Sequence, residues 1–138
     1  MRDTYAVLAR RMEIFRGLSS EEVAKIFAAG MTVEYQAGST VFKKGDRSDE
    51  LYVVLGGSVE VNDGNRTYGV IASGEPLGEM AWISDAPRSL TAVARETTSL
   101  IKISNHILEN LLSREAAIQL LMNIILILTQ RLRLANER

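Results

Sequence analysis

The apolar positions of the first 30 residues recur at helical spacing. In the first half they step by threes and fours until Gly17 interrupts the pattern: Tyr5, Leu8, Met12 and Phe15. A second helix is predicted to begin after Ser19, because Ser19 with Glu22 three residues later is a capping-box pair, and Gly30 is predicted to end it. Residues 1–30 are therefore predicted to form N-terminal helices.

From residue 31 to about residue 103, the pattern changes to short β-branched or aromatic runs separated by glycine and small polar residues. Their spacing fits seven to eight strands. The predicted strands are residues 31–35, 40–43, 51–55, 58–62, 66–71, 89–94 and 97–103. We expect a mainly β fold with flanking helices, an eight-stranded jelly-roll-like β-barrel, because closure into two sheets removes exposed strand edges.

One connection in this β region, residues 73–88, is too long for a hairpin loop and too short for a crossover. A helical turn is predicted within it at residues 78–83. Long loops on a rigid scaffold often carry function, so this connection is the first place to look for chemistry.

Residues 104–138 return to helical spacing. Ser104 is the predicted N-cap of a first C-terminal helix. Ser113 is predicted to cap a second one, which carries Glu115 in its first turn, where an acidic side chain favours the helix dipole.

The last helix is apolar on most of its circumference, since Gln119 and Asn123 are the only polar residues from 118 to 128. One apolar stripe has coiled-coil spacing: Ile118, Leu121, Ile125, Leu128, Leu132 and Ala135. A second stripe lies beside it: Leu120, Ile124 and Ile127. We predict that one stripe packs on the protein's own barrel and the other on the same helix of a second copy, giving a homodimer. The alternative is that both stripes are buried within one chain. Gln119 and Asn123 either contact a partner and set its register or form a plain polar stripe.

The composition limits the possible functions. The chain has 138 residues, the size of one domain (1–138), and with 46% apolar and 24% charged residues it is expected to fold around a core. It has no cysteine and a single histidine, His106, so it lacks the ligands of cysteine-bound or multi-histidine metal centres. A formal net charge of −1 provides no overall positive field, so direct nucleic-acid binding is not expected.

The N-terminal residues do not have the pattern of a signal peptide, and the longest apolar run is expected to be too short to cross a bilayer comfortably. We therefore expect a cytoplasmic protein without membrane insertion.

The 73–88 connection combines three chemical features. Gly78 allows the backbone to approach a ligand closely, and the Glu79 carboxylate, at the start of a helical turn, can accept hydrogen bonds from hydroxyl groups. Arg88 follows Pro87, which stiffens the chain, so its guanidinium is expected to be held in place. Such an arginine near backbone amides suits a phosphate, and a neighbouring glutamate suits a ribose. The alternative from these residues alone is a surface ion pair.

This segment resembles the phosphate-binding cassette of the cyclic nucleotide-binding domain family. The family pattern is approximately Phe-Gly-Glu-Leu/Met-Ala-Leu followed by Pro-Arg-Ser/Thr/Ala-Ala-Thr. Here residues 78–83 read Gly-Glu-Met-Ala-Trp-Ile, and residues 87–91 read Pro-Arg-Ser-Leu-Thr. Residues 45–54 and 57–59 look like the family's glycine-punctuated strands. The terminal helices also fall where the family has them, so the resemblance covers nearly the whole chain.

The resemblance implies that residues 74–91 bind a 3′,5′-cyclic nucleotide. Glu79 would accept a hydrogen bond from the ribose 2′-hydroxyl, helped by the Gly78 amide, and Arg88 would pair with the exocyclic phosphate. The amides of Ala81 and Ser89 would complete the phosphate's shell. The full set of implied ligand-binding residues is Gly78, Glu79, Met80, Ala81, Arg88, Ser89 and Thr91.

The resemblance to bacterial members favours cyclic AMP, with cyclic GMP as the alternative, since the Ser89 hydroxyl suits either base. It implies a non-enzymatic sensor without cofactor or metal. Ligand binding would move the C-terminal helix and so act on an effector domain or protein, and Arg131, Arg133 or Leu128 is a candidate lid over the base.

Departures from the family pattern motivate other functions. Pro-Leu at 76–77 replaces an aromatic pair, and Leu90 stands where alanine is usual, although the small Ala92 on the same strand face offsets its volume. Trp82 replaces a leucine and is expected to anchor the core. One alternative is a ligand-free domain that dimerises through its C-terminal helix. Another is a phosphate-ester hydrolase with Glu79 as base, which would need a metal or a second catalytic group.

Overall fold

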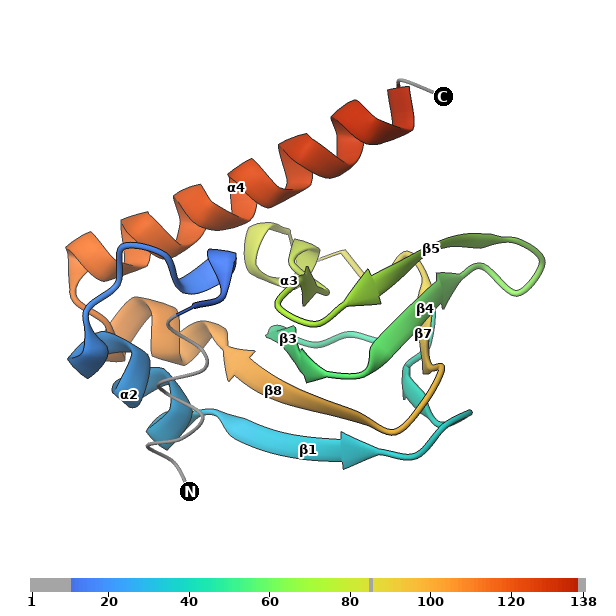
Figure 1. Cartoon of the computed structure of the whole chain (residues 1–138), viewed down its shortest axis with the longest axis horizontal. Helices are drawn as coiled ribbons and strands as arrows, with labels where there is room; N and C mark the ends of the chain where they lie inside the picture. The colour runs from blue at the N-terminus through green and yellow to red at the C-terminus, as the bar shows by residue number, and fades with distance from the viewer. Residues whose placement is uncertain (1–10, 85, 137–138) are drawn as a thin grey trace.

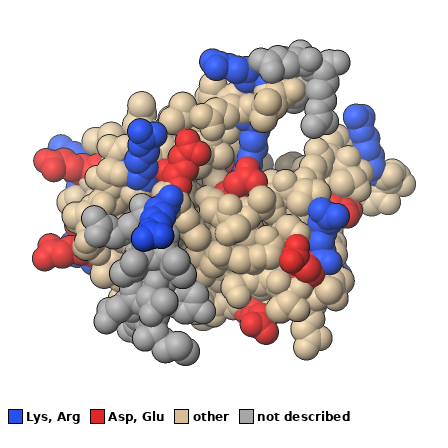
Figure 2. Space-filling view, in the orientation of Figure 1, with Lys and Arg blue, Asp and Glu red and all other residues tan. Residues whose placement is uncertain are grey.

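The computed structural model describes residues 11–84 and 86–136, apart from the side chains of residues 81, 83, 135 and 136. In this part of the chain, two four-stranded antiparallel sheets pack together, and helices cover one of them (Figure 1). The predicted mainly β, jelly-roll-like fold with eight strands and flanking helices is confirmed. On the face seen in Figure 2, acidic and basic side chains are intermixed, and neither sign forms a continuous patch.

Apart from the β4–β5 hairpin, paired strands are not consecutive in sequence, so the chain passes repeatedly between the sheets. One sheet has the order β1-β8-β3-β6, and the other has the order β2-β7-β4-β5. The strands are β1 (Met31–Tyr35), β2 (Thr40–Phe42), β3 (Glu50–Gly56), β4 (Ser58–Asn62), β5 (Thr67–Ala72), β6 (Pro76–Leu77), β7 (Thr91–Ala94) and β8 (Thr98–Ser104).

Strand β3 separates two apolar cores. Successive side chains of a strand point to opposite faces. Leu51 and Val53 therefore pack with the helices, in a cluster that we call the helix-side core. Tyr52 and Val54 pack between the sheets. Because both faces of β3 are buried, its sequence is a continuous apolar run rather than an alternating one.

The N-terminal region agrees with the sequence prediction in its second half only. Helix α2 (Ser20–Ala29) begins as expected, with the Ser19 hydroxyl oxygen accepting from the Glu22 amide at 3.2 Å. The first predicted helix falls largely on residues 1–10, outside the described residues. Its remainder is wrong, because Met12 has an extended backbone and only a short 3-10 turn, η1 (Glu13–Phe15), follows. Burial in the helix-side core, rather than helical periodicity, explains the apolar residues of η1.

The first C-terminal helix begins directly after Ser104, as predicted, but most of it is a π-helix. Ser104 is also the last residue of β8, residues 105 and 106 are α-helical, and the π-helix η2 (Ile107–Leu111) follows. The second prediction is confirmed, since α4 (Arg114–Asn136) begins directly after Ser113. The Ser113 hydroxyl oxygen accepts from the Ala116 amide at 3.1 Å.

The two stripes of α4 have different environments. The stripe of Leu120, Ile124 and Ile127 is buried in the helix-side core. In the coiled-coil stripe, Ile118, Ile125 and Leu132 are exposed by 55%, 53% and 63%. The alternative in which both stripes are buried within one chain is therefore wrong for these three residues.

The two polar residues of α4 bind the protein's own N-terminal segment. The Asn123 side-chain amide donates to the carbonyls of Ile14 (2.8 Å) and Arg16 (2.7 Å), and Gln119 donates to Asn123 Oδ1 (2.9 Å). These contacts replace the partner-register and polar-stripe interpretations. They anchor the middle of α4 to η1.

By length and composition alone, residues 114–134 of α4 meet the requirement for crossing a membrane, with a mean hydropathy of 1.3. The expectation that the chain has no sufficiently long apolar segment was therefore too strict. A core helix of a folded domain meets the same requirement, and one face of α4 packs into the helix-side core here.

Candidate functional site

The 73–88 connection forms a compact unit against β3. Strand β6, which was not predicted, pairs Leu77 with Tyr52 and Pro76 with Val53. The predicted helical turn is present as α3 (Met80–Ile83). The short strand holds the start of the cassette, and the chain then returns to β7.

Gly78 lies between these elements in a conformation that favours glycine. Its φ is +75°, and a Cβ atom at this position would lie 2.5 Å from Arg88 Nη1. Contacts this short require something to shift, so glycine permits the arginine to approach the backbone.

Arg88 is held at both its backbone and its side chain. Its amide donates to the Asp46 carbonyl (2.7 Å), and its carbonyl accepts from the Gly45 amide (2.8 Å). Its guanidinium is buried, with Nη1 donating to the Gly78 carbonyl (3.0 Å) and Nη2 to the Glu50 carbonyl (2.8 Å). The prediction that this guanidinium is held in place is confirmed.

The hydrogen-bonding capacity of Arg88 is only partly used. Among the described residues, its Nε is the one buried side-chain nitrogen or oxygen without a hydrogen-bond partner. No ion pair joins Arg88 to a described carboxylate. The interpretation of Glu79 and Arg88 as a mutual surface ion pair is therefore wrong, and the buried cation lacks a described counterion.

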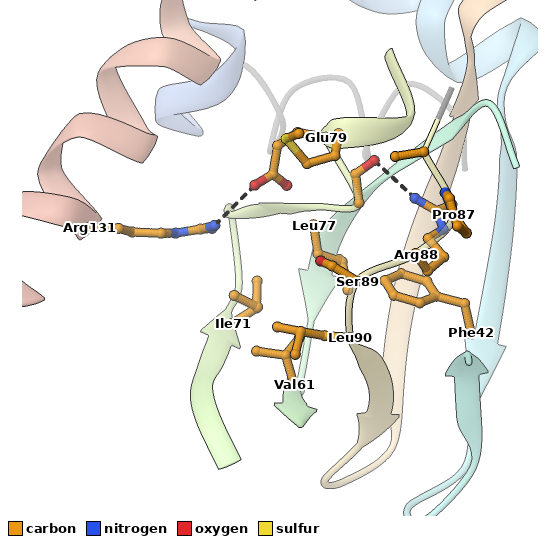
Figure 3. Close-up of a pocket in the computed structure, with 13 residues that line it drawn as sticks. Phe42, Val61, Ile71, Leu77, Glu79, Pro87, Arg88, Ser89, Leu90 and Arg131 are labelled. Carbon is orange, nitrogen blue, oxygen red and sulfur yellow. Dashed lines mark hydrogen bonds and ion pairs between the residues drawn. The ribbon is translucent and has the colours of Figure 1, made fainter. Parts of the chain in front are cut away.

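Glu79 lies at the start of α3 with its side chain 16% exposed. No hydrogen bond from its carboxylate caps this helix. Its Oε1 lies 4.0 Å from Arg131 Nη1 on α4, and Figure 3 shows the two side chains pointing toward each other. The carboxylate thus faces the space between the cassette and α4.

A pocket of about 180 Å³ joins these groups (Figure 3). Its apolar wall comes from both sheets and the cassette, and its charged lining residues are Glu79, Arg88 and Arg131. Beneath the C-terminal part of α4, Figure 2 shows the surface to be hollowed. The lining residues are Phe42, Val61, Ile71, Leu77, Gly78, Glu79, Met80, Ala86, Pro87, Arg88, Ser89, Leu90 and Arg131.

Five of the seven predicted ligand-binding residues line this pocket: Gly78, Glu79, Met80, Arg88 and Ser89. The backbone of Ala81 lies in α3. Thr91 lies in β7 outside this lining, and its hydroxyl oxygen accepts from the Lys44 amide at 3.0 Å. The fold therefore brings the two charged residues of the motif together with its glycine.

The apolar wall was not found from the sequence. Val61 and Ile71 lie on the paired strands β4 and β5, and Phe42 ends β2. Alternation marks such residues as inward-facing, but only the strand order and register show that they meet at the cassette. Leu90 lines the same wall, so its size bears directly on the pocket.

Arg131 reaches the cassette from α4. Its Nη2 donates to the Pro76 carbonyl (2.8 Å), and its Nε lies 3.4 Å from Glu75 Oε2. The sequence marked Arg131 as one of several candidate lids. Of the α4 residues whose side chains are described, Arg131 is the one that lines the pocket.

Trp82 anchors the other side of α3. Its indole nitrogen donates to the Ile103 carbonyl (3.2 Å), and its ring packs against the helix-side core. The predicted anchoring role is confirmed.

Comparison with known proteins identifies the fold and the family. The family model described as "Cyclic nucleotide-binding domain" matches residues 32–115, more than half of the chain. A cyclic nucleotide-binding domain of known crystal structure from Methylobacillus flagellatus has a TM-score of 0.85 and is 26% identical, with 99% of this chain and 83% of that chain covered.

Two curated relatives are parts of kinase systems. A cGMP-dependent protein kinase of Eimeria tenella is 31% identical over 73% of this chain and 10% of its own length. A cAMP-dependent protein kinase regulatory subunit of Mycosarcoma maydis is 31% identical over 70% of this chain and 19% of its own length. The chain thus spans a tenth to a fifth of these relatives. By its match to the family model and by its fold, this chain belongs to the cyclic nucleotide-binding domain family.

Proposed function

We propose that this domain is a non-enzymatic regulatory module that binds a 3′,5′-cyclic nucleotide in the pocket beside Arg88. The main observation behind this proposal is the burial of the Arg88 guanidinium. It lacks a described carboxylate partner, and it lines a pocket that Glu79 also lines. In the proposed complex, Arg88 pairs with the exocyclic phosphate. Glu79 accepts from the ribose 2′-hydroxyl, and the amides of Ala81 and Ser89 add to the phosphate's shell.

The electrostatics favour an anionic ligand. Burying a charge costs free energy unless it is paired, and the carbonyls of Gly78 and Glu50 compensate only through their dipoles. Each hydrogen bond to a charged group contributes about 1.5–3 kcal/mol. A few of them, together with contacts to the apolar wall, reach the roughly 8 kcal/mol of micromolar affinity.

The proposed ligand is cyclic AMP, with cyclic GMP as the alternative. Ser89 is exposed at the rim of the pocket, where its hydroxyl can meet either phosphate or base. The two kinase relatives differ in the nucleotide that they are named for, so likeness to them does not choose the base.

We propose that Arg131 couples the pocket to α4. It connects the helix to the Pro76 carbonyl and to the carboxylates of Glu75 and Glu79. A ribose hydroxyl that engages Glu79 changes this set of contacts. The end of α4 beyond its Asn123 anchor then shifts relative to the cassette, and this shift is the proposed signal. We propose the cytoplasm as the location of the module.

We also propose that the exposed stripe of α4 forms a homodimer. Ile118, Ile125 and Leu132 are exposed at coiled-coil spacing. Among its described residues the helix has three further exposed large apolar side chains: Met122, Leu126 and Leu134. A second copy would cover them. The effector on which the module acts is a further domain or another protein.

A ligand-free interaction domain is the second candidate. The pocket volume of about 180 Å³ is below the roughly 300–1,000 Å³ of typical small-molecule sites, and Leu90 and Arg131 take up part of the space. A hydrolase is not favoured. Glu79, Arg88 and Arg131 are the titratable side chains among the described lining residues, and two arginines cannot act as bases at neutral pH.

Calorimetric titration with cyclic AMP and cyclic GMP tests the proposal. We expect micromolar or tighter binding, which falls by about 100-fold or more in Arg88→Ala and also weakens in Glu79→Ala. Arg95→Ala is the matched control, since this exposed arginine lies in the β7–β8 turn and should leave affinity unchanged. Absence of heat and of thermal stabilisation at millimolar nucleotide would favour the ligand-free domain.

A further inference from the structure

Two aromatic rings lie against the guanidinium of Arg88. Its Cζ atom is 4.4 Å from the ring centroid of Phe42 on β2 and 5.6 Å from that of Tyr52 on β3. Both distances are within the range of about 6 Å in which an aromatic face attracts a cation. The two rings also contact each other, with centroids 5.6 Å apart. We call Phe42 and Tyr52 the aromatic platform, and Figure 3 shows Phe42 beside Arg88.

All the described groups that hold this guanidinium are uncharged. They are the platform and the carbonyls of Gly78 and Glu50. A carboxylate in their place would neutralise the cation, and an incoming anion would have to displace it. Ring faces and carbonyl dipoles orient the cation and leave its full charge for a ligand.

Tyr52 keeps the platform neutral over the physiological range. Burial is the largest cause that raises the pKa of Tyr52 to about 12. Phe42 has no titratable group. The orientation of Arg88 should therefore not depend on pH between about 5 and 9.

The platform is also part of the scaffold that carries the cassette. Tyr52 pairs with Leu77 across β3 and β6, one residue before Gly78. Phe42 lines the pocket itself. A change in either ring therefore reaches Arg88 through the ring itself, and a change at Tyr52 also reaches it through the pairing of β3 with β6.

We propose that Phe42 and Tyr52 are positioning residues that fix the plane of the Arg88 guanidinium for recognition of an anionic ligand. A guanidinium has five N–H donors, and two are used in the described hydrogen bonds, so three remain for the anion. The platform contacts the guanidinium through its ring faces and uses none of these donors. The proposal rests on the proposed function only for the nature of the anion, the phosphate of a cyclic nucleotide.

The first test uses the ligand-free protein. Nuclear magnetic resonance of Arg88 should show ring-current shifts of its side-chain signals and slow exchange of its Nε proton. Both effects should be reduced in Phe42→Leu, which removes the nearer of the two rings but keeps apolar bulk, and retained in Phe42→Tyr. Tyr35→Leu is the matched control, because Tyr35 packs on the same core without a described contact to Arg88. Unshifted Arg88 signals in the wild type would overturn the proposal, whether or not the variants fold.

The second test uses cyclic AMP as the probe. Phe42→Leu should weaken binding by about threefold to tenfold, as expected for loss of a partly buried cation–π contact. The same substitution should have no further effect in an Arg88→Gln background, because it acts through the arginine. If Phe42→Leu lowers the affinity for cyclic AMP equally in the wild type and in Arg88→Gln, the proposal is wrong and the platform contributes only ordinary packing. An equal loss of affinity in Tyr35→Leu would lead to the same conclusion.

The two proposals fail in different ways. A wild type that binds no cyclic nucleotide would overturn the proposed function. The platform would then be tested by the nuclear magnetic resonance signals of Arg88 alone. Binding that collapses in Arg88→Gln but is unchanged in Phe42→Leu would retain the proposed function and overturn the platform.

Discussion

Gly78 and Arg88 depend on each other at the residue scale. The glycine has a positive φ, and the position of its missing Cβ lies 2.5 Å from Arg88 Nη1 and 3.2 Å from Cζ. The arginine in turn donates to the glycine carbonyl. The Gly-Glu pair of the motif thus serves two purposes: the first residue admits the cation, and the second supplies the carboxylate on the other side of the pocket.

We expect Gly78→Ala to weaken cyclic nucleotide binding by tenfold or more, because the added methyl group displaces the guanidinium. The backbone strain should also lower the free energy of unfolding by about 1–2 kcal/mol. Calorimetric titration and thermal melting measure the two effects.

Gly38→Ala is the control for Gly78→Ala, because Gly38 has a similar φ of +88° but open space around it. Gly38→Ala should lower the free energy of unfolding but leave the affinity for cyclic nucleotide unchanged. Wild-type affinity in Gly78→Ala would show that Arg88 tolerates the methyl group.

Asp63 provides a prediction about pH. Its carboxylate accepts from the amides of Asn65 (2.9 Å) and Arg66 (2.8 Å) and from the Tyr68 hydroxyl (3.0 Å), which lowers the pKa of Asp63 to about 2. Because this folded-state pKa lies below the ordinary 3.8, the resulting stability is present above pH 3.8 and is lost as the pH falls toward 2.

Titration of the Asp63 carboxyl resonance should therefore have a midpoint near 2. In Tyr68→Phe the midpoint should rise, although not to 3.8, since both backbone donors remain. A midpoint near the ordinary value in the wild type would mean that these hydrogen bonds do not persist in solution.

At the element scale, the regular strands and helices were predicted well, whereas the two-residue strand β6 and the π-helix η2 were not. Strands β1 and β4 match their predicted ranges, and helices α2 and α4 begin after their predicted serine caps. Strand β6 was missed because two residues cannot display an alternation. The π-helix η2 was missed because its apolar residues fit an ordinary helix equally well.

Only the part of the candidate site that is contiguous in sequence could be predicted. The cassette is contiguous in sequence, so its motif identified Glu79 and Arg88. Phe42, Val61 and Arg131 come from distant elements, and only the register of the sheets and the docking of α4 bring them to the pocket. Alternation and amphipathicity indicate which face of an element is buried, but not which residues meet there.

Among the described α4 residues, Arg131 contacts the Pro76 carbonyl and the carboxylates of Glu75 and Glu79. These contacts give a prediction at the element scale. In the ligand-free protein, Arg131→Gln should speed amide hydrogen exchange in residues 129–134 by about threefold to tenfold, because the helix end loses its contacts to the cassette. Exchange measured by mass spectrometry should rise similarly when cyclic AMP is added to the wild type.

Arg133→Gln is the matched control for this measurement, since Arg133 is exposed and lies two residues further along α4. It should change neither exchange nor its response to ligand. If Arg131→Gln still responds to cyclic AMP as strongly as the wild type, another contact couples the pocket to α4.

At the scale of the whole molecule, α4 has a buried apolar stripe, two separate polar attachments among its described residues and one open face. Asn123 anchors its middle to η1, and Arg131 contacts the cassette nearer its end. The open face has apolar side chains exposed by about half. This division lets the end of the helix respond to the pocket while its middle stays fixed to the fold, and a second helix packed on the open face would experience that movement.

We expect the wild type to be a dimer at tens of micromolar in sedimentation experiments, because a contiguous apolar face of this kind is normally covered. Ile125→Glu should make it a monomer, since two copies would bring the charges together in a desolvated seam. The side chain of Ile125 is 53% exposed, so the melting temperature of the monomer should change little and its affinity for cyclic AMP should persist. Met31→Glu, at a site exposed by 62% on β1, is the matched control and should remain dimeric. A monomeric wild type would instead leave the open face for the effector, and Ile125→Glu would then abolish signalling without altering the oligomeric state.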